Sequence, residues 1–243
     1  MIGRFLRICW LILLVGCTVP STLPGPAPTA PPQVQDQTGV LPSPEVAARN
    51  FVTVVDRVEP VAEAFCRRAR RDGNCDYGIY VASDVDLPPN AFQTVDADGS
   101  PVIVFTISLI AMARNQDELA FILGHEAAHH IAGHIDKAQA EALKGALILG
   151  TAAALGGADQ ARVTEAQRIG AAFGARRFSK EHELEADALG ARIAYRAGYD
   201  PMLGAAYFDR LPDPGDAFLG THPPNAARLA TVARVTEALR AGG

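Results

Sequence analysis

The segment from His125 to His129, in which Glu126 directly follows the first histidine, constrains this chain more than any other. On an α-helix, residues four positions apart lie on one face, so both imidazoles can bind one zinc ion. The carboxylate between them can act as a general base on a water molecule. The segment therefore requires a helix and predicts a metal-dependent site for peptide-bond hydrolysis.

The flanking sequence favours this helix. Asn115, followed three positions later by Glu118, is typical of a helix start, and the apolar residues that follow contain no proline. We expect the helix to run from about residue 116 to 134 and to end near Gly133. Gly124 lies in its interior, where glycine costs about 1 kcal/mol relative to alanine. This glycine indicates that another segment passes close to the helix beside the metal site.

A second helix, expected from about residue 180 to 197, carries acidic residues at helical spacing. Glu183 and Asp187 are four positions apart and therefore share one face. Glu183 can complete a site of two histidines and one glutamate that leaves the fourth position to water. Asp187 can accept a hydrogen bond from the other ring nitrogen of a ligand histidine, with His125 as the expected partner, and so orient the ring.

Together these motifs resemble the gluzincin family of CaaX prenyl proteases and HtpX-type peptidases. The resemblance covers roughly residues 51–239 and is greatest with soluble periplasmic members of the LoiP and BepA type. It implies an α+β, zincin-like fold, mostly helical with a small antiparallel or mixed sheet, and one zinc ion per chain. The residues that carry it are Gly124-His125-Glu126-x-x-His129, His134, Glu183-x-Glu185-Ala186-Asp187-x-x-Gly190 and Thr221-His222-Pro223-x-x-x-x-Arg228.

The resemblance also assigns roles to residues outside the metal ligands. His222 follows a segment rich in proline and glycine, which indicates a loop. It is expected either to donate a hydrogen bond to the oxyanion of the transition state or to occupy the open zinc position and gate the enzyme. Arg228 is expected to anchor the site through acidic partners. His130 and His134 are expected to flank the helix or support the ligands without binding metal.

The rest of the pattern predicts a helix at residues 44–71, a strand at 77–82 and a hairpin formed by 91–95 and 101–106. By resemblance, an edge strand should pair with the substrate backbone above the metal helix. Val102–Phe105 is the candidate for this strand. A buried core strand is the alternative for the same residues.

Residues 142–157 form a largely apolar segment interrupted by glycines. The segment is too short for a transmembrane helix. A core helix is the first interpretation, and an apolar hairpin that contacts the membrane or covers the cleft is the second.

The N-terminal residues predict export and membrane attachment. Residues 1–16 combine two arginines with a short apolar run, as in a signal peptide, and they end at Cys17 in a sequence similar to a bacterial lipobox. Cys17 would be the lipidated first residue, and Thr18 favours sorting to the outer membrane. An ordinary cleaved signal or an uncleaved anchor is the alternative. Residues 17–44 are rich in proline and predict a semi-rigid tether, and 45–243 form the predicted metallopeptidase domain.

Composition and the remaining cysteines agree with one exported domain. In an oxidising periplasm we expect a disulfide between Cys66 and Cys75, with two buried thiols as the alternative. The chain has 243 residues, of which 49% are hydrophobic, enough for one sizeable core. Its formal net charge of −5 and the lack of a basic tract argue against nucleic-acid partners.

The sequence therefore predicts a zinc endopeptidase of the bacterial cell envelope. It would be lipid-anchored to the outer membrane in the periplasm and hydrolyse unfolded, misfolded or mislocalised envelope proteins. A set of three ligands plus a base favours catalysis, because structural zinc sites are usually closed by four protein ligands. The alternatives are an assembly chaperone for outer-membrane proteins with little proteolytic turnover, and a lipid-anchored binding module whose zinc is structural.

Overall fold

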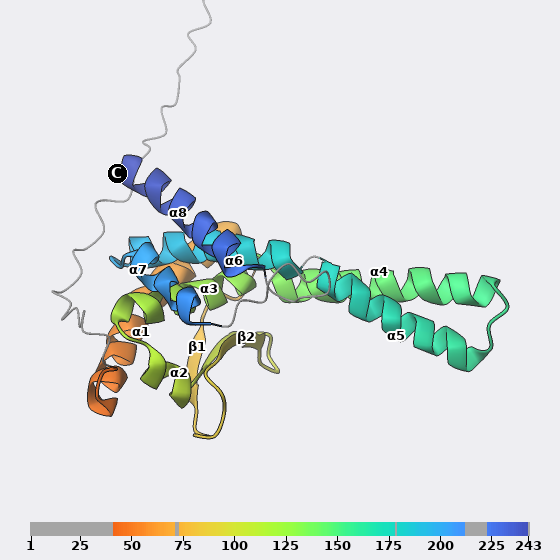
Figure 1. Cartoon of the computed structure of the whole chain (residues 1–243), viewed down its shortest axis with the longest axis horizontal. Coiled ribbons are helices and arrows are strands. Elements are labelled where there is room, and N and C mark those ends of the chain that lie inside the picture. Colours follow the sequence, from red (N-terminus) through yellow and green to blue (C-terminus); the bar gives the residue numbers. More distant parts are fainter. Residues whose placement is uncertain (1–40, 71–72, 178, 212–222, 243) are drawn as a thin grey trace, which may run out of the picture.

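The computed structural model describes residues 41–70, 73–177, 179–211 and 223–242 (Figure 1). The predicted signal peptide, the predicted lipidation site Cys17, most of the predicted tether and His222 lie outside these residues. The described part is mostly helical and contains a small mixed sheet, so the expected α+β, zincin-like class is confirmed.

Helix α1 (Pro44–Ala69) supplies one layer of the core. Ser43 caps it by accepting a hydrogen bond from the N–H of Val46, and a proline occupies the first turn, where the missing N–H costs nothing. An apolar stripe of this helix is buried and packs against α3 (Gln116–Ile131). The fully buried members of the stripe are Val54, Val58 and Ala62.

Strands β1 (Gly78–Ala82), β2 (Ala91–Val95) and β3 (Pro101–Thr106) form the described sheet in the order β1-β3-β2. β1 is parallel to β3, whereas β2 is antiparallel to it. Thr106 ends β3 and caps the short helix α2 (Ile107–Met112), which leads into α3.

The prediction that Val102–Phe105 forms the edge strand is wrong. These residues belong to β3, which lies between the other two described strands, and Ile103 and Phe105 are fully buried. The alternative interpretation, a buried core strand, is the correct one. The edge strand beside α3 is β2. The sequence of a hairpin does not reveal which of its strands is central, because that depends on where β1 joins.

The disulfide between Cys66 and Cys75 is present, with a Cα–Cα separation of 5.7 Å. It ties the last turn of α1 to the segment before β1. Both cysteines are buried in the core, so the bond joins the helical layer to the sheet.

Helix α3 is central to the molecule. The sheet lies on one side of it through β2, and α6 (Ser179–Arg196) packs along the other side. Three further elements follow α6 in the chain and complete this layer (Figure 1). They are α7 (Pro201–Ala205), the 3-10 helix η1 (Ala206–Arg210) and α8 (Asn225–Ala241).

Helices α4 (His134–Leu155) and α5 (Gln160–Arg177) form an antiparallel hairpin that projects from the body of the molecule (Figure 1). The prediction of a core helix at residues 142–157 is therefore wrong, since Leu143 and Leu147 are 70% and 66% exposed. Two glycines of this segment, Gly145 and Gly150, lie at the seam between the two helices. They allow α4 and α5 to pack on each other, and the leucines of α4 stay outside the seam. None of the helices that the structure describes is long and apolar enough to cross a membrane.

Candidate active site

Helix α3 carries the motif residues, and both of its ends are well defined. Asn115 accepts a hydrogen bond from the N–H of Glu118 at 2.9 Å, as the sequence predicts for a helix start. The helix ends at Ile131, and Gly133 follows in the left-handed conformation with φ 67°. The helix bounds therefore agree with the expected ones to within about one turn.

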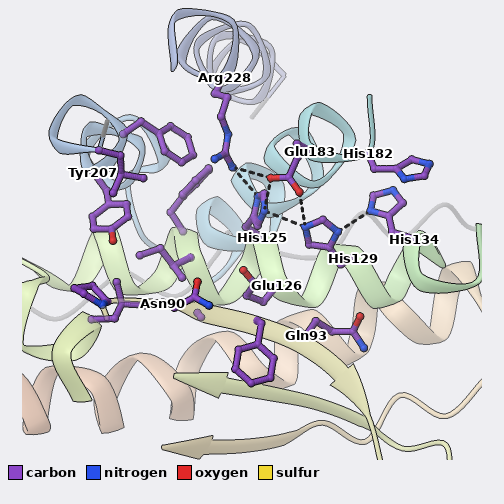
Figure 2. A pocket seen from close by; sticks show the side chains of 18 of the residues that line it. Asn90, Gln93, His125, Glu126, His129, His134, His182, Glu183, Tyr207 and Arg228 are labelled. Atoms are coloured by element: carbon purple, nitrogen blue, oxygen red, sulfur yellow. Dashed lines mark hydrogen bonds and ion pairs between the residues drawn. The ribbon is translucent and has the colours of Figure 1, made fainter. Parts of the chain in front are cut away.

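His125, His129 and Glu183 converge from α3 and α6 (Figure 2). The two Nε2 atoms are 3.1 Å apart, and carboxylate oxygens of Glu183 lie 3.5 Å and 3.4 Å from them. Ligand atoms placed about 2.1 Å from a tetrahedral zinc ion are separated from each other by roughly 3.4 Å. The donor types and their spacing therefore fit a zinc ion held by two imidazoles and one carboxylate.

The close approach of α3 and α6 brings Glu183 to the histidines. A methyl group on Gly124 would lie 2.8 Å from the carbonyl oxygen of Gly190, and one on Gly190 would lie 2.7 Å from the backbone nitrogen of His125. Neither position can hold a side chain without moving backbone. The segment expected to pass beside Gly124 is thus α6, and the two glycines set the distance between the ligand-bearing helices.

Asp187 and Arg228 both contact His125. The carboxylate of Asp187 lies 2.9 Å from Nδ1 of His125 and accepts hydrogen bonds from Arg228 at 2.8 Å and 2.7 Å. Burial alone would raise the pKa of Asp187, but the bonds and charges of Arg228 and His125 outweigh it and lower that pKa. The ring of Phe208 covers the Arg228 guanidinium at 3.8 Å. Asp187 therefore stays charged and, with a metal ion bound at Nε2, would hold the proton of His125 on Nδ1.

His129 has a different support, formed by His134 and Glu185. The Nδ1 atoms of His129 and His134 are 2.9 Å apart, and Nε2 of His134 lies 3.1 Å from the Glu185 carboxylate. His182 stacks on His134 with ring centroids 4.4 Å apart and an angle of 14° between the planes. If Nε2 of His129 faces the metal, its Nδ1 carries the proton and donates to His134. His134 must then be neutral and donate from Nε2 to Glu185.

The contact between His134 and His129 follows from a break in the helix. Continued as one helix, residue 134 would lie almost opposite His125. The chain instead turns at Gly133, and His134 begins α4 in contact with His129. The sequence signal is a histidine that directly follows the glycine at the end of the motif helix. His130, in contrast, contacts the backbone carbonyl of Asn74 at 2.8 Å, away from the metal ligands.

Glu126 lies between α3 and β2 (Figure 2). Burial raises the pKa of its carboxyl group to about 7. The negative charge of Glu183 also raises this pKa. Positive charge at His125 and a backbone hydrogen bond from Gln93 both lower it. A carboxyl group with a pKa near neutrality can accept a proton and return it at physiological pH.

A cavity of about 640 Å³ surrounds these residues between β2, α3 and the later helices. One end is apolar and aromatic, and the opposite end reaches the base of the hairpin at Ala138 of α4 and Ala175 of α5. The apolar end is lined by Phe121, Ile122, Tyr207, Phe208 and Leu211.

Strand β2 turns backbone groups toward this cavity. The N–H of Thr106 donates to the carbonyl of Asn90, so this opposed pair is hydrogen-bonded to β3. Hydrogen-bonded and non-bonded pairs alternate along an antiparallel ladder. The N–H and C=O groups of Ala91 and Gln93 therefore face away from β3. The N–H of Gln93 donates to the Glu126 carboxylate, and an extended peptide can reach the other three groups.

Comparison with known proteins identifies related sequences. The family model described as Peptidase family M48 matches residues 49–236. The chain is 28% identical over 170 residues to the mitochondrial metalloendopeptidase OMA1 of Saccharomyces cerevisiae, covering 64% of this chain and 46% of that protein. It is 29% identical over 152 residues to OMA1 of Schizosaccharomyces pombe, covering 59% and 42%. It is 28% identical over 137 residues to OMA1 of Arabidopsis thaliana, covering 55% of this chain and 27% of that protein. The chain thus spans less than half the length of these curated relatives.

Proposed function

Because this chain belongs to peptidase family M48, we propose that it is a zinc-dependent endopeptidase. The observation that carries the proposal is the spacing of His125, His129 and Glu183, which fits one zinc ion. A fourth protein ligand would make the site structural. Here a half-buried glutamate and an edge strand lie beside the three donors, as hydrolysis of a polypeptide requires.

A bound zinc ion supplies a Lewis acid that polarises a carbonyl group and lowers the pKa of water to about 7. The chain's own residues prepare the site for it. Asp187 holds His125 with Nε2 toward the metal position, and His134 does the same for His129. Arg228 keeps Asp187 ionised within the protein interior.

Glu126 is the proposed general base. Its carboxylate takes a proton from the attacking water and passes it to the leaving nitrogen, for which a pKa near 7 is suitable. His222 lies outside the described residues. We propose, by its place in the family motif, that it stabilises the oxyanion or gates the site.

β2 is the proposed platform for the substrate backbone. An extended peptide that pairs with Ala91 and with the carbonyl of Gln93 would cross the cavity beside Glu126 and the three proposed ligands. Main-chain hydrogen bonds tolerate many side chains, so this mode suits an enzyme that cuts varied proteins. Only unfolded or extended segments can add to a strand in this way.

We propose that the protein acts in the bacterial cell envelope on unfolded or misfolded proteins, anchored by lipid at Cys17. The sequence at Cys17 supports export and lipidation. The disulfide between Cys66 and Cys75 supports an oxidising compartment. The curated relatives are mitochondrial proteins, so the envelope location rests on these two features.

Glu126→Gln tests the proposed activity. The variant should bind zinc like the wild type, because the three ligands are untouched, and should cut unfolded casein about 10²–10⁴-fold more slowly. Metal content by elemental analysis and cleavage by gel electrophoresis measure the two effects. Wild-type cleavage by this variant would contradict the role of Glu126. Restoration of envelope integrity by the inactive variant in a deletion strain would favour the chaperone alternative.

A further inference from the structure

The α4–α5 hairpin exposes apolar side chains along its length. On α4, Leu147, Ile148 and Leu155 are 66%, 67% and 85% exposed, and Ile169 on α5 is 50% exposed. We call these four residues, together with Leu143, the hairpin surface. Apolar side chains gathered on one projecting element usually mark an interaction site.

The hairpin cannot bury these residues within itself. Its seam is formed by backbone approaches between Gly145 and Gly170 and between Glu141 and Gly174, where a methyl group would collide with the opposite helix. Such a seam leaves no room for leucine or isoleucine side chains. The hairpin surface can therefore be covered only by a partner from outside the hairpin.

The hairpin is continuous with the wall of the cavity. Ala138 and Ala175, at its base, line the cavity beside His129 and His134. At a rise of 1.5 Å per residue, Leu147 lies about 14 Å and Leu155 about 26 Å further along the axis of α4. An extended peptide covers these distances with about four and eight residues. A polypeptide that leaves the cavity at this end can therefore reach the hairpin surface.

We propose that the hairpin surface binds apolar segments of the polypeptide substrate outside the cavity. This inference rests on the proposed endopeptidase function and specifies its substrate class: long, unfolded chains with apolar residues several positions from the cleaved bond. Residues 145–158 contain no ionisable side chain. The distal part of α4 can thus select for apolar content without demanding a particular sequence.

Binding measured in the Glu126→Gln background tests the inference without needing hydrolysis. Two fluorescent peptides share one central sequence, six residues in one and twenty in the other, with leucines in both extensions of the longer peptide. Leu147→Gln together with Ile148→Gln removes apolar surface but keeps helix-forming residues. We expect this variant to weaken binding of the long peptide about tenfold or more and to leave binding of the short peptide unchanged.

Matched controls keep the result specific. Val52→Gln and Val85→Gln change side chains that are 57% and 68% exposed outside the hairpin, and they should bind both peptides like the parent protein. Leu147→Met with Ile148→Leu keeps the surface apolar and should also bind like the parent. Equal loss for both peptides, or no loss for either, would overturn the inference.

The same variants test the alternative that the hairpin surface binds a lipid membrane. Sedimentation with vesicles of phosphatidylcholine and phosphatidylglycerol measures that binding. If the Leu147 and Ile148 change abolishes vesicle binding while long-peptide binding persists, the hairpin surface is a membrane contact and the inference is wrong. If the parent binds the long peptide through the hairpin but the wild type cuts neither peptide, the endopeptidase proposal fails and the binding surface stands.

Discussion

At the residue scale, the two histidines proposed as metal ligands are held by unlike partners. His125 contacts a buried carboxylate that is paired with Arg228, whereas His129 contacts a neutral imidazole backed by Glu185. The first support is charged, and the second depends on which nitrogen of each ring carries a proton. Substitutions that change donors and acceptors should therefore affect the two ligands differently.

His134→Gln and His134→Lys separate positioning of His129 from simple packing. The carbonyl of glutamine can accept from Nδ1 of His129, so zinc affinity should change by only a few fold. Lysine has donors alone and would face the N–H of His129, so affinity should fall about 10–100-fold. Competition with a chelator gives the affinity, and the absorption spectrum of the cobalt-substituted protein reports ligand geometry. Equal behaviour of the two variants would show that His134 does not orient its neighbour.

At the element scale, the distance between α3 and α6 determines whether the ligands meet. Gly124→Ala should lower the free energy of unfolding by about 1–3 kcal/mol, because the methyl group meets the backbone of Gly190. Alanine raises helix propensity by about 1 kcal/mol, so propensity alone predicts the opposite sign. Denaturant unfolding and zinc affinity should both show the loss. Gly242→Ala, where the methyl group has 3.4 Å to its nearest neighbour, should be close to neutral in the same measurements.

The disulfide joins α1 to the segment before β1, and its removal should loosen the link between these layers. Replacing both Cys66 and Cys75 by alanine should cost about 2–3 kcal/mol of unfolding free energy, as expected for a short loop. Urea unfolding measures this cost. A reducing agent should destabilise the wild type by a similar amount and leave the double variant unchanged. An unfolding free energy of the wild type that does not change on reduction would mean that the bond contributes little.

At the scale of the whole molecule, the proposed metal site joins two helices separated in the chain by the entire hairpin. Binding to the folded state alone stabilises it by about 2.7 kcal/mol at a free-metal concentration 100 times Kd. Saturating zinc should therefore raise Tm above that of the chelated protein by roughly 5–10 °C for a domain of this size. Scanning calorimetry with and without chelator measures the shift. His129→Ala should abolish it, and a shift that survived this change would place the metal elsewhere.

The sequence alone determined the features that depend on local physics. The cap at Asn115, the two-histidine face, the acidic pair on the next helix and the bounds of β2 and β3 all follow from spacing and turn chemistry, which act over a few residues. The pairing of Cys66 with Cys75 followed from the oxidising compartment that the N-terminal motif predicts.

Only the tertiary structure decided which strand lies at the edge, where His134 points and whether residues 142–157 are buried. Each of these depends on contacts between segments distant in the sequence. β1 pairs with β3, so β2 forms the edge of the described sheet beside α3. The turn at Gly133 brings His134 back to His129. The glycine seam pairs α4 with α5 instead of with the core. Apolar residues have the same spacing in the sequence whether they pack against the core, a neighbouring helix or a bound chain, so periodicity cannot distinguish these outcomes.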